Sequence, residues 1–454
     1  MQEFRPWGHK LIDWVADYLE SPERHPVLST VQPNDILNAL PACGPEHGEP
    51  MDLIFADFEK IVLPGVTHWN HPNFLAYFAN TSAPPAVLAE LLAAALNANG
   101  ILWKTSPAVT ELELVCMRWL LDWMGLPATW FGLIFDTASI STLHALQAAR
   151  VFVAPETRDD GAPRDLIVYC SDQAHSSVEK GAMALGYGRK QVRRIPCDPE
   201  TFRLRPVDLE AAIAKDRAAG LRPCCVVATV GTTSTTSVDP VREIAEITTR
   251  EGLWLHVDAA YAGSAAVAKE FHWLLDGCGN ADSMVFNPHK WLMVPVDCSV
   301  FFTRRPEILR QAFALLPEYL KTADDGVNLM DYGIPLGRRF RALKLWFVLR
   351  YYGREGLAKM ILDQVAMVNE IADRLAADPR FEIAAPHAMS VICFRLRGPD
   401  EANRKLLTDI NSDGRFFLSH TVLNGSYVLR IAVGNLLTNR ETLHGLWNLI
   451  DRLA

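Results

Sequence analysis

The sequence LWLHVDAAYAGS at residues 253–264, followed by SMVFNPHKWL at residues 283–292, decides the fold class of this chain. Each segment opens with an apolar run. The first run ends at Asp258, and the second is followed by Asn287 and Lys290. Short apolar runs that alternate with helical segments predict buried strands of a parallel sheet. Ligands of such sheets bind beyond the carboxyl ends of the strands, so we expect Asp258 and Lys290 to share one ligand site.

Three more predicted strands are followed by polar residues. The strand before residues 136–139 leads into a helix, whose first N–H groups and hydroxyls suit a phosphate. A second strand leads to His175, an imidazole that can stack on an aromatic ring. A third leads to a Gly/Thr loop that contains Thr233. Taken singly, these segments also fit an ordinary helix cap, a structural histidine and a plain turn.

Together the five segments point to pyridoxal 5′-phosphate (PLP). A lysine amine can bond to an aldehyde cofactor, and a carboxylate can keep a pyridine nitrogen protonated. Lys290 and Asp258 are candidates for these two roles, and residues 136–139 are candidates for holding the phosphate. The alternative is that Asp258 caps a helix and Lys290 lies on the surface. The convergence of the other segments on the same ligand favours the cofactor.

The chain resembles the group II PLP-dependent decarboxylases, and within them the aromatic L-amino-acid decarboxylases. The resemblance rests on several segments in the family's order and spacing: residues 136–139, 171–177, 229–233, 256–264 and 287–292, with 64–69, 106–113 and 334–341. It implies an α/β fold, the PLP-dependent fold type I (aspartate-aminotransferase-like). This fold has a mixed, mostly parallel central sheet in the large domain and a small C-terminal α+β domain.

The chain is long enough for several domains, and we predict three parts. Residues 1–80 form an N-terminal helical arm, which begins with an amphipathic helix. Residues 81–360 form the large PLP-binding domain, and residues 361–454 form the small C-terminal domain. The resemblance implies that the arm packs on a dimer partner and that the active site lies at the subunit interface.

The resemblance also assigns roles to single residues. The catalytic residues it implies are Lys290, His175, Asp258 and Tyr319. Tyr319 would be the proton donor, in a polar segment at residues 311–335 that we expect to cover the site. The expected cofactor-binding residues are Thr137, Ala138, Ser139, His175, Thr233, Asp258, Ala260, Asn287, His289 and Lys290, with Leu336 and Gly337 reaching the other subunit's cofactor.

For the substrate, we predict an aromatic pocket. Its candidate residues are Trp69, Tyr77, Phe78, Asn80, Ile101 and His175, although the aromatic ones could equally be core residues. Asn80 stands where the animal enzymes usually have Thr, and Ile101 where they usually have Phe. These departures put a simple transfer of Dopa preference in doubt. Which aromatic amino acid is preferred therefore stays open.

The composition of the chain disfavours several classes of partner. The formal charge of −9 and the lack of a Lys/Arg block disfavour nucleic acid as a partner. The nine cysteines include no C-x-x-C pair, which indicates reduced thiols of a cytoplasmic protein. We expect no membrane span, because the most apolar long stretch contains polar residues, and we expect no metal site.

The predicted function is PLP-dependent decarboxylation of an aromatic L-amino acid to the corresponding amine and CO2, the reaction of a carboxy-lyase. One alternative is an aromatic acetaldehyde synthase, which couples decarboxylation to oxidative deamination. Tyr319 and His175 argue against it, because those enzymes usually change one of these positions. A glutamate-type decarboxylase is disfavoured by the lack of a basic pocket cluster. A non-catalytic PLP-fold scaffold is disfavoured because every cofactor-contacting position is kept.

Overall fold

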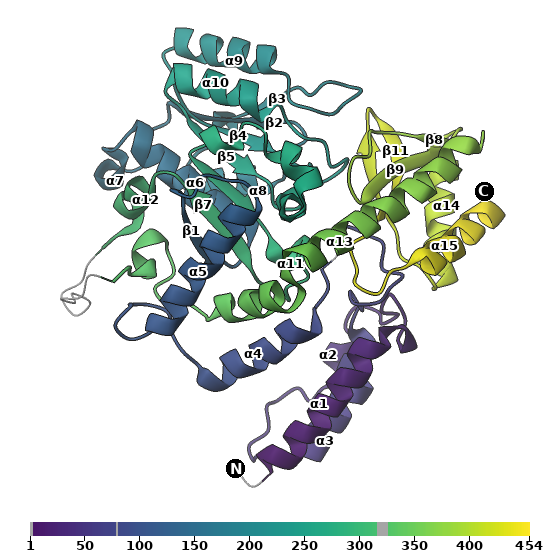
Figure 1. Ribbon diagram of the computed structural model, residues 1–454. Coiled ribbons are helices and arrows are strands. Elements are labelled where there is room, and N and C mark those ends of the chain that lie inside the picture. Colours follow the sequence, from purple (N-terminus) through teal and green to yellow (C-terminus); the bar gives the residue numbers. More distant parts are fainter. Residues whose placement is uncertain (1–2, 79, 316–325) are drawn as a thin grey trace.

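The computed structural model describes residues 3–78, 80–315 and 326–454. Figure 1 shows a lobe of N-terminal helices, a large α/β body and a smaller C-terminal unit. The long helix α13 (Arg341–Ala377), which is kinked at Gly353, runs from the body to the C-terminal unit. In the part that the structure describes, no helix is both long and apolar enough to cross a membrane. The nine cysteines are all free thiols, and seven of them are buried.

A seven-stranded sheet forms the centre of the large body, in the order β1-β7-β6-β5-β4-β2-β3. The pairs among β3, β2, β4, β5 and β6 are parallel, whereas β7 runs antiparallel to both β6 and β1. The expected mixed, mostly parallel sheet is therefore confirmed. The strands are β1 (Phe131–Phe135), β2 (Leu166–Ser171), β3 (Val192–Ile195), β4 (Arg222–Thr229), β5 (Trp254–Asp258), β6 (Ser283–Phe286) and β7 (Ser299–Thr303).

Helices cover both faces of this sheet, which is why its central strands read as continuous apolar runs. On one face α6 lies across β4, β5, β6 and β7, with α8 and α12 beside it. On the other face lie α5, α9, α10 and part of α13. The helices of the body are α4 (Pro84–Leu96), α5 (Pro107–Trp123), α6 (Ala138–Val153), α7 (Thr157–Asp160), α8 (Ser177–Ala184), α9 (Pro206–Ala218), α10 (Val241–Glu251), α11 (Pro288–Trp291) and α12 (Pro306–Phe313).

The C-terminal unit has an antiparallel sheet in the order β10-β11-β9-β8. Its core packs this sheet against α14, α15 and the second half of α13. The elements are β8 (Phe381–Ile383), β9 (Val391–Leu396), α14 (Asp400–Asp413), β10 (Ser419–Leu423), β11 (Ser426–Ala432) and α15 (Arg440–Leu453). Because α13 runs through residues 360 and 361, the boundary between the two domains stays a prediction.

The N-terminal lobe contains the expected amphipathic helix, α1 (Phe4–Glu20), with α2 (Asp35–Ala39) and α3 (Met51–Asp57). The apolar side of α1 contacts the segment after α3: Trp14 stacks on Tyr18 and meets Phe58 edge-on, with ring centroids 5.3 Å apart. No residue of α1 is buried in the single chain. Helix α1 therefore contributes no buried side chain to the single chain.

A buried ion pair connects the body to the segment at residues 334–338. The Arg338 guanidinium donates to a carboxylate oxygen of Glu113 at 2.5 Å, and both side chains are almost fully buried. The same oxygen accepts the backbone N–H of Ile134 at 2.7 Å. Breaking a buried pair is costly because it leaves one charge unpaired, so this contact should fix the segment firmly.

We predict that Glu113→Ala lowers the free energy of unfolding by about 3–5 kcal/mol, because Arg338 would stay buried without an anion. Asp409→Asn, which removes an exposed ion pair with Lys405, should cost less than about 1 kcal/mol. Urea unfolding of both variants measures the difference. Equal stabilities would contradict the role given to the buried pair.

Candidate functional site

A cavity of about 230 Å³ lies beyond the carboxyl ends of β4, β5 and β6, at the start of α6. Ten of the residues predicted from sequence meet there, together with three others. The residues that line it are Phe78, Thr137, Ala138, Ser139, His175, Thr229, Gly231, Thr233, Asp258, Ala260, Tyr261, Asn287 and Lys290. The sheet thus brings together segments up to about two hundred residues apart, as the parallel-strand argument predicts.

Asp258 and Lys290 are held by neighbouring strand ends. Asp258 is the last residue of β5 and is buried, and its Oδ1 accepts the N–H of Ala260 at 3.0 Å. The carbonyl of Ala260 accepts the N–H of Asn287 at 2.9 Å, which ties the end of β6 to that of β5. Burial lowers the pKa of the Lys290 ammonium, and the Asp258 carboxylate opposes this shift. A larger fraction of the amine is therefore neutral and nucleophilic.

The start of α6 forms the anion-binding end of the cavity. Thr137 is the N-cap of α6, and the first residues of the helix, Ala138 and Ser139, line the cavity. N–H groups in the first turn have no partner within a helix, and the helix dipole favours negative charge there. Asn287 is buried, and its Oδ1 has no hydrogen-bond partner in the structure. An anionic ligand would accept hydrogen bonds from the helix N–H groups, whereas Asn287 Oδ1 needs a donor and only the Asn287 amide N–H can bind an anion.

His175 is held by the start of α8. Its Nδ1 accepts the backbone N–H of Ser177 at 3.2 Å and lies 2.9 Å from the Ser177 hydroxyl. Because Nδ1 accepts a backbone N–H, the neutral ring carries its proton on Nε2. Desolvation lowers the pKa of His175, the Lys290 ammonium adds to this effect, and Asp258 opposes it. The ring is therefore mostly neutral near pH 7.

Several predicted residues do not line the cavity in the single chain. His289 is buried, and its Nδ1 accepts the N–H of Cys298 at 2.9 Å. Trp69 and Tyr77 stack on each other with centroids 5.8 Å apart and are partly exposed. Four other predicted residues lie off the cavity wall: Asn80, Ile101, Leu336 and Gly337. Ile101 packs with Leu102 and Met330, and Leu336 and Gly337 are exposed. Tyr319 lies outside the described residues, so these assignments stay predictions.

The structure adds an aromatic column that sequence reasoning missed. The Phe78 ring stacks on Tyr261 at 4.0 Å, and Tyr261 stacks on Trp291 at 4.6 Å. Lys290 Nζ lies 5.1 Å from the Phe78 ring centroid, within the range of a cation–π contact. Tyr261 and Trp291 both belong to the two quoted sequence segments, but no local pattern links them to Phe78.

The small domain contacts the Gly/Thr loop of the site through several residues, among them the buried Arg430 of β11. Its guanidinium donates to the carbonyls of Thr233 and Ser234, both at 2.9 Å, and lies 5.6 Å from the Phe78 ring. Burial lowers its pKa. Arg430 therefore fixes the Gly/Thr loop from the side of the small domain. The sequence gives little sign of this role of Arg430, because a single arginine in a strand is common.

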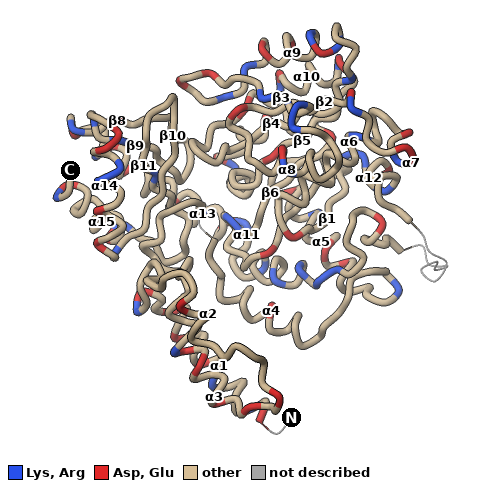
Figure 2. Tube along the Cα trace, turned by 180° about the vertical axis from the view of Figure 1, so that it is seen from behind, with Lys and Arg blue, Asp and Glu red and all other residues tan. Residues whose placement is uncertain are grey.

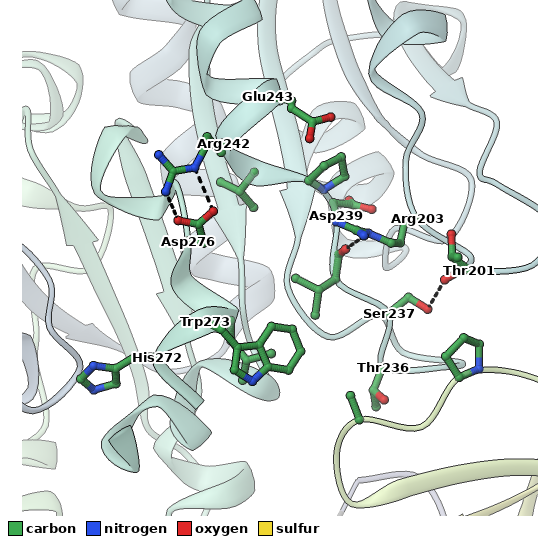
Figure 3. Close-up of a pocket in the computed structure, with 16 residues that line it drawn as sticks. Thr201, Arg203, Thr236, Ser237, Asp239, Arg242, Glu243, His272, Trp273 and Asp276 are labelled. Atoms are coloured by element: carbon green, nitrogen blue, oxygen red, sulfur yellow. Dashed lines mark hydrogen bonds and ion pairs between the residues drawn. The ribbon is translucent and has the colours of Figure 1, made fainter. Parts of the chain in front are cut away.

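A larger cavity, of about 690 Å³, lies on another part of the body, beside the turn that precedes α10 (Figure 3). Figure 3 shows Arg242 facing its ion-pair partner Asp276. Asp276 directly follows the short helix at residues 269–275, which carries His272 and Trp273. None of its lining residues is a lysine or a cysteine. The chemistry needed for an aldehyde cofactor is present only at the smaller cavity of the two.

The smaller cavity fits PLP by its own residues. The lysine amine, which burial keeps partly neutral, suits the aldehyde of PLP, the buried carboxylate suits its pyridine nitrogen, and the helix N-terminus suits its phosphate. The unpartnered Asn287 Oδ1 adds a polar group that awaits a ligand. Fold and site together define a PLP-dependent enzyme of fold type I. Among the described residues, no group of three or more His, Cys, Asp or Glu side chains could hold a metal ion.

Comparison with known proteins identifies the family. The pyridoxal-dependent decarboxylase conserved domain matches residues 33–397, and the chain belongs to this family. An aromatic-L-amino-acid decarboxylase from Catharanthus roseus is 40% identical over 100% of this chain and 94% of its own length. A phenylacetaldehyde synthase from Arabidopsis thaliana is 39% identical, over 100% of this chain and 96% of its own. Relatives of two activities thus match along the whole chain.

A solved structure agrees with this assignment. The crystal structure of Oryza sativa TDC with PLP and tryptamine superimposes with a TM-score of 0.97. It is 38% identical in sequence, and the match covers 100% of this chain and 98% of the other. The expected fold type I and the expected cofactor are both confirmed. The chain is an enzyme, a PLP-dependent amino-acid decarboxylase.

We predict that Lys290→Ala abolishes turnover but still binds PLP weakly, because the N-terminus of α6, Asn287 and Asp258 remain. In the wild type, borohydride reduction followed by peptide mapping should place the pyridoxyl group on Lys290. Lys344→Ala, at another buried lysine, serves as the control, because its ammonium pairs with Glu90 outside the cavity. A pyridoxyl group on any other lysine would contradict the assignment.

Proposed function

We propose that the protein decarboxylates an aromatic L-amino acid to the corresponding amine and CO2. The observation that carries this proposal is the cavity in which Lys290, Asp258 and His175 meet beside the N-terminus of α6. Full-length similarity to decarboxylases of aromatic amino acids supports the substrate class. The direct test incubates the PLP-loaded protein with each amino acid and measures CO2, amine, aldehyde and peroxide. Amine and CO2 in equal amounts, from aromatic substrates only, is the expected result.

The cofactor would be held by the residues of the cavity. Thr137, Ala138, Ser139 and Asn287 would bind its phosphate, and Thr233 and Ala260 would lie against its ring. When bound, PLP supplies an electron sink that weakens the bonds to the substrate α-carbon. Asp258 would keep the pyridine nitrogen protonated, since an adjacent carboxylate favours the charged form.

Two further groups would act on the substrate. His175 presents its Nε2–H to the cavity and would orient the substrate carboxylate while it stacks on the cofactor ring. The Lys290 amine would exchange with the substrate amine, which requires the neutral form that burial favours. Tyr319, by resemblance, would donate a proton from Oη to the α-carbon after CO2 leaves.

The substrate end of the site would be completed by a second copy of the chain. Helix α4 carries a single charged residue, Glu90, and Figure 2 shows it almost free of charge. Four of its leucines, Leu88, Leu91, Leu92 and Leu96, are about half exposed, which is unusual for a contiguous apolar face. Ile334 and Leu336 are exposed as well. We propose a homodimer in which these surfaces and the N-terminal arm are buried, with Leu336 and Gly337 reaching the partner's cofactor.

The proposed location is the cytoplasm, because all nine cysteines are free and most are buried in apolar surroundings. The predicted three-part domain division is proposed with it, in which the arm packs on the dimer partner. The second candidate activity is the aromatic acetaldehyde synthase reaction. It is favoured by the 39% identity to the Arabidopsis thaliana phenylacetaldehyde synthase and would appear as aldehyde and peroxide in the product assay.

We predict that Asn80→Thr combined with Ile101→Phe changes the relative efficiency of the enzyme toward Phe, Tyr, Trp and Dopa. An apolar contact in a pocket is worth about 1–3 kcal/mol, so ratios should shift by roughly 10- to 200-fold. The measurement is kcat/KM for each substrate, expressed as ratios within one preparation so that losses of folded protein cancel. Unchanged ratios would show that other residues select the substrate.

We predict that Tyr319→Phe still releases CO2 but forms less amine, because phenylalanine has no hydroxyl to protonate the α-carbon. The electrons left on that carbon would then be open to O2, with aldehyde, ammonia and peroxide as products. The amine-to-CO2 ratio is measured in air and under nitrogen. A variant that makes one amine per CO2 at the wild-type rate would remove Tyr319 from the reaction.

A further inference from the structure

Two buried polar atoms beside Asp258 have no hydrogen-bond partner in the structure. One is Nε2 of His256, which precedes Asp258 by two residues on β5, so that both side chains extend from the same face of the strand. The other is Oγ1 of Thr229, which is paired with Asp258 across the β4–β5 register. Both residues are almost fully buried. An unpaired polar group in the interior is costly, so each needs an explanation.

The hydrogen bonds of Ser283 determine which nitrogen of His256 carries the proton. The Trp254 Nε1–H can only donate, and it lies 2.9 Å from the Ser283 hydroxyl oxygen. That oxygen also lies 2.9 Å from His256 Nδ1. If the serine hydroxyl donates to Nδ1, every group in this chain of contacts is satisfied except Nε2. The opposite assignment would leave the serine hydroxyl hydrogen unpaired as well.

His256 is therefore a neutral ring with its proton on Nε2. Burial lowers its pKa to about 4, with Asp258 as the one charged group that opposes the shift. The contacts from Trp254 through Ser283 thus fix the Nε2–H of His256 as a donor, two residues before Asp258 on β5. This donor is present throughout the neutral pH range.

Thr229 is held equally firmly. Its N–H donates to the buried Asp239 carboxylate at 2.8 Å, and its carbonyl accepts the N–H of Asp239 at 2.9 Å. The other carboxylate oxygen of Asp239 accepts the N–H of Leu204 at 2.8 Å. The backbone of Thr229 is therefore fixed, and its side chain lies on the wall of the cofactor cavity.

We propose that one bound water joins His256 Nε2, Thr229 Oγ1 and the Asp258 carboxylate. Buried waters have two to four polar partners, and this water would satisfy both unpartnered atoms at once. The water would accept a hydrogen bond from the Nε2–H of His256 and donate one to the Asp258 carboxylate. His256 is then a positioning residue, which holds Asp258 ionised and oriented toward the pyridine nitrogen. This inference rests on the proposed function and deepens it.

The first test is a double-mutant cycle between His256 and Asp258. His256→Leu should lower kcat about 10- to 100-fold, as the loss of an outer partner does at a metal ligand. The same change in an Asp258→Asn background should have little effect, because the group through which it acts is gone. His256→Gln keeps an N–H donor and should recover much of the loss. Equal losses in both backgrounds would overturn the proposal.

The second test does not depend on turnover. The holoenzyme is titrated with pH while the long-wavelength absorbance of bound PLP is followed. His256→Leu and Thr229→Val should shift the titration in the same direction as Asp258→Asn, but less. Thr142→Val is the matched control, because Thr142 Oγ1 is another buried hydroxyl without a partner but does not line the cavity. A control shift as large as that of Thr229→Val would overturn the assignment.

A crystal structure of the wild-type holoenzyme decides the case if the histidine variants fail to fold. An ordered water within hydrogen-bond distance of His256, Thr229 and Asp258 is the expected result. A site filled by protein atoms, or a ring turned so that Nε2 meets another acceptor, would overturn the proposal. A wild type that binds PLP but releases no CO2 would instead contradict the proposed function, so the two failures are distinguishable.

Discussion

The parallel pairing of β4, β5 and β6 is the constraint on which the rest of this structure depends. These strands are covered by helices on both faces, so most of their side chains are apolar. Charged groups are tolerated mainly where the strands end. Because parallel strands end at the same edge, Asp258 after β5 and Lys290 after β6 meet there without any further device. The cavity follows directly from the topology of the sheet.

The electrostatics of the cavity follow from where each group sits on this edge. Lys290 is deprived of water, which makes its amine easier to deprotonate. The start of α6 supplies partial positive charge at the opposite end. His175 and His256 are both held with the proton on Nε2 by donors to Nδ1. The site therefore offers neutral donors around a single buried carboxylate, which suits a cationic ring and an anionic phosphate in one ligand.

The parts that were predictable from sequence are those encoded by neighbouring residues. A strand followed by Thr137-Ala138-Ser139, or one that ends at Asp258, contains its own signal, and the structure brings these residues together at one cavity. The aromatic column was missed because it joins Phe78 to residues nearly two hundred positions later. Arg430 was missed for the same reason.

The two ends of the site differ in how much of them a single chain supplies. Most of the cofactor end is lined by residues of one chain, among them Asp258 and His175, which hydrogen bonds to nearby backbone N–H groups hold in place. Leu336 and Gly337 of the partner subunit are proposed to reach it as well. Of the residues proposed for the substrate end, Phe78 and His175 line the same cavity, whereas Trp69 and Tyr77 are partly exposed and Ile101 packs with Leu102 and Met330 outside it. In the proposed dimer, a partner's surface would complete that end. A substitution at Asn80 or Ile101 can then alter substrate preference without removing a residue of the cofactor cavity, because neither residue lines it. Asn80 and Ile101 are therefore the positions of the predicted site at which substrate preference can be changed separately from cofactor binding.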